Sequence, residues 1–408
     1  MKRRRIGAID VGTTKVCTIM ADTDGFGLRI LGVGIVPSHG LQKGMVVNIN
    51  EARESIRQSV KQAEETAGYR MESAYVGVTG RHITSQNNHG VVTINRNDRL
   101  VKPGDLKRVL NVARSIKVPS ENKLLHIIPR NYIVDGQEGV KNPVGMHGFR
   151  LDVETHIITA AVTSVQNLTK CIRGVGVEVD DLVLEPLASA EACLSPEEKL
   201  DGVLLADIGG GTTDIAVFRD NSIMHTSVLP VAGYQVTRDI SIGLGLSFEL
   251  AEEMKKRYGS VMPLEEGSGD RTVTGDGHSV SYLDLSEIIR VRIEELMRLV
   301  MLELPGADYA KLIPSGIVLT GGGANLPGVA ELASEVTRLP VRTGVPPNLY
   351  GVSDVLRNPC YSTSVGLLMW KFANQGSKNW KANKNGALSG FVSRFLGLFG
   401  TRKPEQAS

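Results

Sequence analysis

The sequence lacks several features that would reveal its class at once. Its four cysteines among 408 residues, Cys17, Cys171, Cys193 and Cys360, lie far apart and form no CxxC pair. This spacing suits neither a disulfide scaffold nor a zinc site, so we expect reduced thiols in a cytoplasmic protein. No apolar run reaches the roughly 18 residues that a membrane-spanning helix needs, so any contact with a membrane has to come from its surface.

Charge of one sign and aromatic residues are also scarce. The net charge is +2, aromatic residues make up 5% of the chain, and they do not interleave with a basic stripe. We therefore expect no nucleic-acid partner. Hydrophobic residues at 41% and charged residues at 22% are typical of a soluble globular protein. Because 408 residues exceed one ordinary core, the length predicts several packed units.

One pattern occurs twice. Residues 5–21 read as a strand, a Gly12-Thr13-Thr14 turn and a second strand, and residues 203–218 repeat this around Gly209 to Thr213. Two similar hairpins roughly 200 residues apart predict a duplicated lobe. A buried-strand pattern at 316–323 ends in three glycines and precedes a helical pattern from 328 to 337. Together these patterns predict an α/β protein.

Segments of different character interrupt the repeats. Residues 81–161 mix strands with a helical face at Leu106, Val109, Leu110, Ala113 and Ile116. Residues 233–305 are rich in helix, with one helix expected to begin at an Asp284 cap. Both segments are predicted to be insertions. Residues 254–257, Met-Lys-Lys-Arg, are interpreted as a solvated helix face, and His82, His89, His126, His147 and His156 fit no metal motif.

The two hairpins suit a polyphosphate. Backbone N–H groups can converge on phosphate oxygens only where glycine and small hydroxyl residues let the main chain approach. The candidate phosphate-binding residues are Gly12, Thr13, Thr14 and Lys15 in the first turn and Gly209, Gly210, Gly211, Thr212 and Thr213 in the second. Lys15 adds a positive charge. Asp10 and Asp207, at the ends of their strands, suit a hydrated magnesium ion that they would hold through waters.

Each hairpin taken alone is explained as well by a tight turn with a hydrogen-bonded Asp. The two turns together with the glycine run at 321–323 favour nucleotide binding. Neither a Walker-A pattern nor a strand-linked G-x-G-x-x-G is present. This argues against a nucleotide site of the P-loop or Rossmann type.

The two glycine turns and the glycine run at 321–323, in this order along the chain, resemble the actin, sugar-kinase and DnaK-type chaperone superfamily. The resemblance covers residues 5–372 and implies an actin-like two-lobed ATPase fold with duplicated mixed-sheet lobes and an inserted α+β subdomain. It further implies that ATP is the nucleotide and that the adenosine lies against Gly321, Gly322, Gly323 and Ala324.

Within the superfamily, residues 9–16, 207–214 and 317–326 resemble the bacterial cell-division protein FtsA family. That family polymerises and tethers the tubulin-like protein FtsZ to the inner membrane. The resemblance implies a peripheral protein on the cytoplasmic face of the membrane at the division septum. It also implies that FtsZ binds to the insertion at residues 233–305 in the second lobe. The implied divisions are lobe 1 at 1–80 and 162–195 around the insertion 81–161, lobe 2 at 196–232 and 306–360 around the insertion 233–305, a connecting helix at 361–373, a linker at 374–387 and a membrane helix at 388–400.

Glu185, in the run Leu184-Glu185-Pro186-Leu187-Ala188, resembles the glutamate that positions the attacking water in DnaK-type and MreB proteins. Many FtsA-like chains lack an acidic residue at this position. Because this chain has one, Glu185 is a candidate for positioning the water that hydrolyses ATP. The alternative is a surface carboxylate stabilised by a helix dipole. We expect ATP binding, at most slow hydrolysis and no metabolic activity.

The C-terminal residues form an amphipathic pattern. One helical face would carry Leu388, Phe391, Val392, Phe395, Leu396, Leu398 and Phe399, with Arg394 on the other side facing anionic lipid headgroups. Such a short helix binds a membrane surface reversibly. The alternative is a helix that folds back on the protein. The polar stretch 374–387 favours membrane binding, because a helix of the protein's own core rarely needs a flexible linker.

The predicted function is therefore an ATP-binding, actin-like division protein that forms filaments and tethers FtsZ to the membrane. Two alternatives share the fold. A metabolic kinase or phosphatase would need a site for its acceptor, and no acceptor motif is evident. A pilus-assembly relative would not be expected to end in this amphipathic pattern.

Overall fold

The computed structural model describes residues 4–23, 27–262, 271–306 and 308–373. Within these ranges, its contacts separate two compact units, one from residues 4–84 and 160–368 and the other from residues 85–159 and 369–373. The predicted linker 374–387 and membrane helix 388–400 lie outside the described residues. Within the described ranges, no helix is both long enough and apolar enough to cross a membrane.

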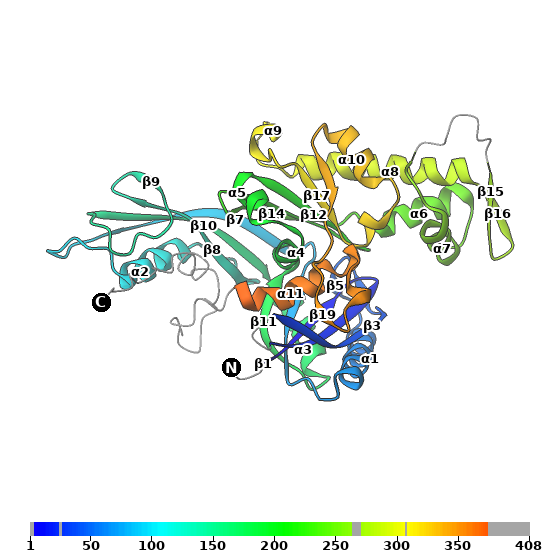
Figure 1. The fold of residues 1–408 in the computed structure, drawn as a ribbon, viewed down its shortest axis with the longest axis horizontal. Helices are drawn as coiled ribbons and strands as arrows, with labels where there is room; N and C mark the ends of the chain where they lie inside the picture. Colours follow the sequence, from blue (N-terminus) through cyan, green and yellow to red (C-terminus); the bar gives the residue numbers. More distant parts are fainter. Residues whose placement is uncertain (1–3, 24–26, 263–270, 307, 374–408) are drawn as a thin grey trace, which may run out of the picture. The chain divides into compact units, whose positions relative to one another are not determined.

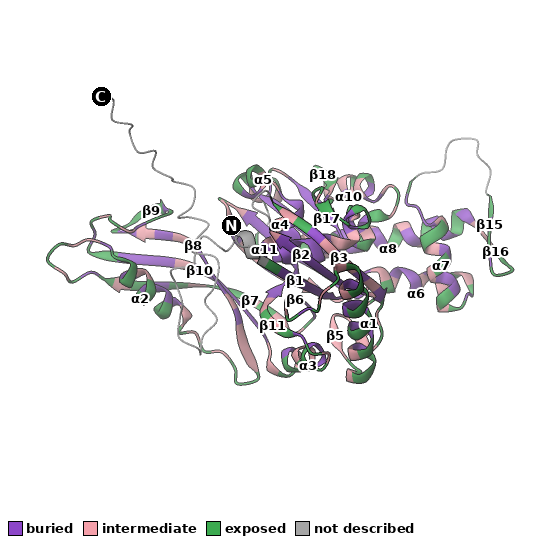
Figure 2. Ribbon diagram, turned by 60° about the horizontal axis from the view of Figure 1, so that its bottom comes forward, coloured by how far each residue is buried: buried purple, intermediate pink, exposed green. Residues whose placement is uncertain are grey.

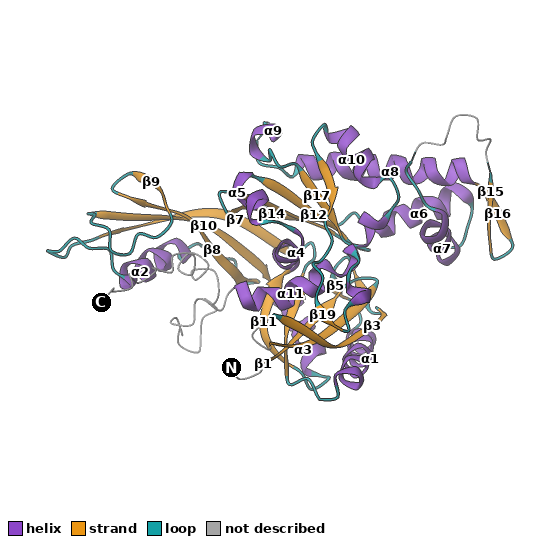
Figure 3. Ribbon diagram, in the orientation of Figure 1, coloured by secondary structure: helices purple, strands orange, loops and turns teal. Residues whose placement is uncertain are grey.

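The first sheet of the larger unit carries the first glycine turn (Figures 1 and 3). Its six strands lie in the order β11 (Glu178–Leu184), β6 (Ser73–Val78), β1 (Arg4–Val11), β2 (Lys15–Thr23), β3 (Leu28–Pro37) and β19 (Tyr350–Gly351). Helix α1 (Ile49–Ala67) packs on β2 and β3. It begins where the Asn48 side chain accepts hydrogen bonds from two backbone N–H groups, and it ends at Gly68 in the left-handed conformation.

The second sheet carries the other glycine turn. Its strands lie in the order β14 (Ser222–Leu229), β13 (Thr213–Arg219), β12 (Val203–Ile208), β17 (Ile317–Thr320) and β18 (Val341–Thr343). In both sheets, three consecutive antiparallel strands form a meander whose first strand also pairs in parallel, β1 with β6 and β12 with β17. This shared topology confirms the predicted duplication, and we call the two sheets with their helices lobe 1 and lobe 2.

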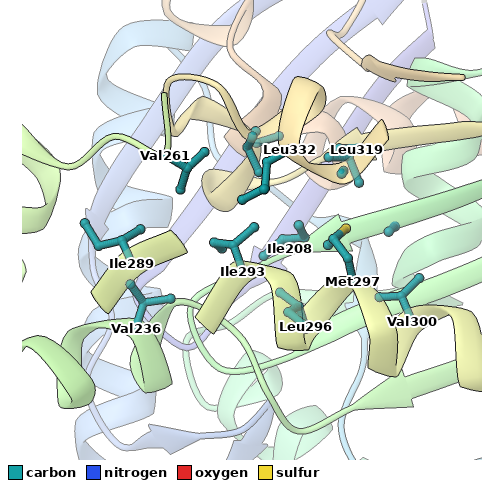
Figure 4. Close-up of a cluster of buried hydrophobic side chains, with 14 of the residues drawn as sticks. Ile208, Val236, Val261, Ile289, Ile293, Leu296, Met297, Val300, Leu319 and Leu332 are labelled. Carbon is teal, nitrogen blue, oxygen red and sulfur yellow. The ribbon is translucent and has the colours of Figure 1, made fainter. Parts of the chain in front are cut away.

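Lobe 2 has a large hydrophobic core between its sheet and helix α8 (Tyr282–Leu302), shown in Figure 4. The buried side chains of α8 recur at helical spacing and meet Ile208 of β12 and Leu319 of β17. The predicted Asp284 cap is wrong. The helix is capped by Ser281, whose hydroxyl accepts the Asp284 N–H at 3.0 Å, because a capping side chain bonds the N–H three residues further on.

The smaller unit is an α+β body. Its four strands lie in the order β7 (Ile83–Thr93), β10 (Arg150–Ala161), β8 (Asn122–Val134) and β9 (Gln137–Val140). Helix α2 (Pro103–Arg114) buries Val109, Leu110 and Ala113 in the core of this unit, which confirms the helical face predicted there. Ile116 lies beyond the end of the helix. Figure 2 colours the buried residues of the chain purple.

The remaining elements connect or extend these sheets. Lobe 1 and the connections to lobe 2 contain β4 (Leu41–Gln42), β5 (Met45–Val46), α3 (Val162–Arg173), α4 (Glu185–Cys193), α5 (Pro196–Asp201), η2 (Asp354–Leu356), η3 (Pro359–Tyr361) and α11 (Ser362–Ala373). Lobe 2 further contains α6 (Gly233–Leu244), α7 (Phe248–Tyr258), β15 (Thr272–Gly275), β16 (His278–Ser281), α9 (Tyr309–Leu312), η1 (Gly322–Asn325) and α10 (Val329–Thr337).

Candidate functional site

The two predicted phosphate loops form the same turn. In the first, the Gly12 N–H donates to the Lys15 carbonyl at 3.0 Å, and in the second the Gly209 N–H donates to the Thr212 carbonyl at 2.9 Å. Each turn joins the first two strands of its meander, β1 to β2 and β12 to β13. The repeated sequence pattern therefore corresponds to a repeated backbone geometry.

The two loops also contact each other. A Cβ atom on Gly210 would lie 2.2 Å from Thr14 Cγ2, and one on Gly211 would lie 2.5 Å from Thr13 Oγ1. Only glycine permits this approach, because any other side chain would occupy the same space. The Thr13 hydroxyl also accepts the Gly44 N–H at 3.1 Å. The structure thus brings the loops together, although nearly 200 residues separate them in the sequence.

Asp10 and Asp207, the predicted metal-facing residues, are both buried beside these loops, at 5% and 7% exposure. Asp10 Oδ2 accepts the Ser364 hydroxyl at 2.8 Å. Asp207 Oδ2 accepts two hydroxyls, from Ser189 at 2.6 Å and from Thr363 at 2.9 Å. Burial raises the pKa of both carboxyl groups, while these hydrogen bonds and the charge of Lys15 act in the opposite direction.

Sequence reasoning missed Asp214. It lies opposite Asp207 in the β12–β13 ladder and accepts hydrogen bonds from the hydroxyls of Thr79 and Thr212. Burial, together with the charge of Asp207, raises its pKa to about 7. A signal was available, because Asp214 directly follows the Thr212-Thr213 pair, and a carboxylate at that place faces the same side of the hairpin as Asp207.

Glu185 is buried at the first residue of α4, at 8% exposure. The alternative of a surface carboxylate is therefore wrong. Burial, and then the charges of Asp10 and Asp214, raise the pKa of Glu185 well above its ordinary value. None of the described residues donates a hydrogen bond to its carboxyl group, which borders a small pocket. His82 borders the same pocket, and both its ring nitrogens are buried without a hydrogen-bond partner among the described residues.

Lys15 is the cation that counters these carboxyl groups. Burial favours its neutral form, but Asp10, Asp207 and the thiols of Cys360 and Cys17 together outweigh burial and raise the pKa of Lys15. Four buried carboxyl groups, those of Asp10, Glu185, Asp207 and Asp214, thus share one lysine. This excess of negative charge fits a divalent cation. Within the described ranges, no group of three or more His, Cys, Asp or Glu residues is arranged to hold a metal ion.

The third glycine turn lies against the second loop. Gly321 follows β17 with a φ of +82°, and a Cβ there would lie 2.4 Å from Asp207 Oδ1. A Cβ on Gly323 would meet Ile208 Cγ2 at 2.4 Å. Gly322 and the buried Ala324 complete the turn as part of η1. The structure therefore gathers all three predicted landmarks around Asp207.

The interpretation of residues 254–257 as a solvated helix face is wrong for two of its members. Met254 is fully buried. The Lys255 ammonium group is largely buried and donates to the Gly233 carbonyl at 3.2 Å and the Thr237 hydroxyl at 2.8 Å. Gly233 in turn donates its N–H to the Gly209 carbonyl at 3.1 Å. Lys255 is thus a second cation near the second loop, and Glu252, which pairs with it at 2.6 Å, was the signal that sequence reasoning overlooked.

Two facing hairpins on duplicated sheets, with buried carboxyl groups between them, are the arrangement of the actin-like ATPase fold, and the chain has this fold. Solved structures support the assignment. The chain is similar to a PilM-PilN type IV pilus biogenesis complex (TM-score 0.63, 17% identity, 89% of this chain and 97% of the other covered). It is also similar to MreB 5 of Spiroplasma citri bound to AMPPNP (TM-score 0.55, 15% identity, 90% and 96% covered). At these identities the likeness shows the fold alone.

Sequence comparison is more specific. The family model described as cell division protein FtsA matches residues 204–366, and the SHS2 domain inserted in FtsA matches residues 80–159. Cell division protein FtsA of Pseudomonas aeruginosa is 45% identical over 378 residues, with 91% of this chain and 90% of the relative covered. The Bacillus subtilis protein of the same name is 40% identical over 380 residues, with 91% and 85% covered. The chain belongs to the FtsA family of cell division proteins.

This membership does not favour the two alternatives. The pilus-related structure matches in fold at 17% identity, whereas the division proteins match in sequence along most of the chain. The same holds for a metabolic kinase or phosphatase, since the family models and relatives described above are division proteins.

Proposed function

We propose that this chain binds ATP with magnesium between its two glycine loops, polymerises, and tethers FtsZ to the cytoplasmic membrane through the amphipathic helix at 388–400. The observation that carries the nucleotide site is the contact between Thr13 and Thr14 of one loop and Gly210 and Gly211 of the other. A polyphosphate that both loops bind would receive backbone N–H groups from two sheets. Its binding would therefore stabilise one relative position of the lobes.

Each loop has a defined part in this proposal. The backbone N–H groups of 12–14 and 209–213 donate to phosphate oxygens, and Lys15 supplies a positive charge. Residues 321–324 hold the adenosine. The likeness to an MreB structure with bound AMPPNP supports the choice of an adenine nucleotide.

Asp10 and Asp207 would orient the waters of the magnesium ion, which neutralises phosphate charge when bound. Glu185 lies close enough to Asp10 and Asp207 to interact with their charges, and its carboxyl group would accept a hydrogen bond from the attacking water. A carboxylate there can take a proton from that water. Burial raises the pKa of this carboxyl group well above its ordinary value.

The test of the nucleotide site is calorimetry with Asp207→Asn, a change that keeps the shape of the side chain. We expect ATP affinity in magnesium to fall by tenfold or more, and ATP affinity in EDTA to change little. Glu185→Gln should keep the affinity and lower the rate of phosphate release. Equal affinities of wild type and Asp207→Asn in magnesium would reject the site.

The lobe 2 insertion is the proposed contact with FtsZ. It exposes apolar side chains on α6 and α8, including Ile242 at 71% and Val291 at 57% exposure, and exposed apolar groups of this kind often mark protein contacts. Self-association into filaments is proposed from the family resemblance.

The tether is tested by liposome flotation with MgATP, anionic vesicles and FtsZ from the same cell. We expect FtsZ to float only with the full-length chain, and not with a chain truncated after Lys384. If the chain floats and FtsZ does not, the membrane helix is supported and the tether is rejected. If neither floats, the membrane role fails as well.

A further inference from the structure

Helix α11 begins with three consecutive hydroxyl residues, Ser362, Thr363 and Ser364, and all three are buried at 1%, 7% and 0% exposure. Buried hydroxyl groups need hydrogen-bond partners, because an unpaired one loses its hydration without compensation. The hydrogen-bond partners of these hydroxyls therefore identify the residues that the first turn of α11 holds in place.

Two of the three hydroxyls bind carboxylates from different lobes. Ser364 donates to Asp10 Oδ2 at 2.8 Å, and Asp10 belongs to β1 of lobe 1. Thr363 donates to Asp207 Oδ2 at 2.9 Å, and Asp207 belongs to β12 of lobe 2. Ser362 has other partners, since it bonds with the Thr320 hydroxyl at 2.6 Å and lies 3.1 Å from the Cys193 sulfur.

Adjacent residues of a helix keep a fixed separation of about 3.8 Å between their Cα atoms. The two carboxylates are therefore tied to neighbouring points of one rigid element, although they come from different sheets. Each accepts its hydroxyl with Oδ2, which leaves Oδ1 for other partners. A hydrogen bond to an ionised carboxylate is stronger and more directional than one between neutral groups.

We propose that Thr363 and Ser364 are positioning residues that set the orientation and spacing of Asp10 and Asp207 for a hydrated divalent cation carried by the nucleotide. The inference rests on the proposed magnesium nucleotide site. Cation binding and the relative position of the lobes are then coupled through the first turn of α11, because both carboxylates are held there.

The two hydroxyls are not equivalent. Among the described residues, Asp10 accepts its side-chain hydrogen bond from Ser364 alone, whereas Asp207 keeps a second donor, Ser189 at 2.6 Å, when Thr363 is changed. Ser364→Ala should therefore weaken cation binding more than Thr363→Val does. The double variant Thr363→Val with Ser189→Ala should match or exceed Ser364→Ala.

The experiment measures ATP affinity of the full chain over a magnesium titration and again in EDTA. We expect Ser364→Ala to raise the magnesium concentration at half-saturation by roughly tenfold, the size of one hydrogen bond to a charged group, and to leave the affinity in EDTA unchanged. Ser362→Ala is the matched control. It removes a buried hydroxyl from the same turn without touching a carboxylate, so it should lower stability and leave the magnesium midpoint in place.

Conservative variants separate positioning from folding. Thr363→Ser keeps the hydroxyl and should keep the wild-type magnesium midpoint even if its Tm falls. The proposal is overturned if Ser364→Ala and Ser362→Ala share one magnesium midpoint, or if Thr363→Ser shifts the midpoint as far as Thr363→Val does. A wild-type chain whose ATP affinity is indifferent to magnesium would instead reject the magnesium site on which the inference rests.

Discussion

The Thr79 hydroxyl donates a hydrogen bond to the Asp214 carboxylate, and this bond joins the two lobes. Thr79 directly follows β6 of the first sheet, and Asp214 lies on β13 of the second. Both are buried, at 5% and 3% exposure. Because Gly44 packs against Thr79 and donates its N–H to Thr13, the bond is close to the first phosphate loop.

Replacing Thr79 by Val, which has nearly the same shape, should destabilise the chain by roughly 1–3 kcal/mol, because the buried Asp214 carboxylate loses a donor. It should also speed nucleotide release, since one bond between the lobes is lost. Urea unfolding and the release rate of a fluorescent ATP analogue measure the two effects. Thr18→Val is the control, because Thr18 bonds with Ser59 inside lobe 1. If Thr79→Val destabilises without changing release more than Thr18→Val, the bond is structural only.

Asp214 predicts a dependence of stability on pH. Its pKa is raised from an ordinary 3.8 to about 7 by burial. Between those values the folded chain keeps a proton that the unfolded chain has lost, so stability falls as the pH rises toward 7 and levels off above it. Asp214→Asn removes this contribution and should therefore stabilise the chain more at pH 8 than at pH 5.

Thermal unfolding in EDTA from pH 5 to pH 8 tests this expectation. The slope that one proton contributes is at most about 1.4 kcal/mol per pH unit. Asp201→Asn, at an exposed carboxyl group, is the control and should give a profile parallel to the wild type. A parallel profile for Asp214→Asn as well would show that its carboxyl group is ionised in the folded chain across this range.

The sequence predicted the fold where local chemistry decides structure. Gly12-Thr13-Thr14 and its counterpart at 209–213 specify tight turns between short apolar strands, and the structure has those turns between β1 and β2 and between β12 and β13. Turn residues and apolar spacing act over a few neighbours, so one sequence suffices to read them. The assigned roles of these loops stay predictions.

The parts of the site that could not be predicted depend on contacts between residues that are far apart in the sequence. Ser189, Thr363 and Ser364 are small polar residues without a motif, and they matter because folding brings them to Asp10 and Asp207. The charged run around Lys255 predicts a solvated face for the same reason: the Gly233 carbonyl that accepts its hydrogen bond lies 22 residues away in the sequence. Burial of a charged side chain is decided by tertiary contacts, which periodicity alone does not identify.

The contact between the loops gives a third prediction. Gly210→Ala would place a methyl group 2.2 Å from Thr14 Cγ2, so the loops must move apart. We expect ATP affinity to fall by tenfold or more. Gly104→Ala in α2 is the control, because a Cβ there also meets no atom within 4 Å and Gly104 belongs to none of the three glycine turns, so affinity should stay within about twofold. Calorimetry compares the two. Equal affinities would show that the nucleotide does not need the close approach of the loops.

The amphipathic pattern at 388–400 gives a fourth prediction, which rests on the sequence. Phe395→Glu with Leu396→Glu places two charges on the proposed apolar face, and transferring them from water into the lipid interface is unfavourable. We expect the variant to stay below the vesicles in flotation and to bind ATP as the wild type does. Ser393→Glu is the control, because it puts a charge on the opposite face. A double variant that still floats would reject the helix as the membrane anchor, while loss of ATP binding would indicate that the segment folds back on the body.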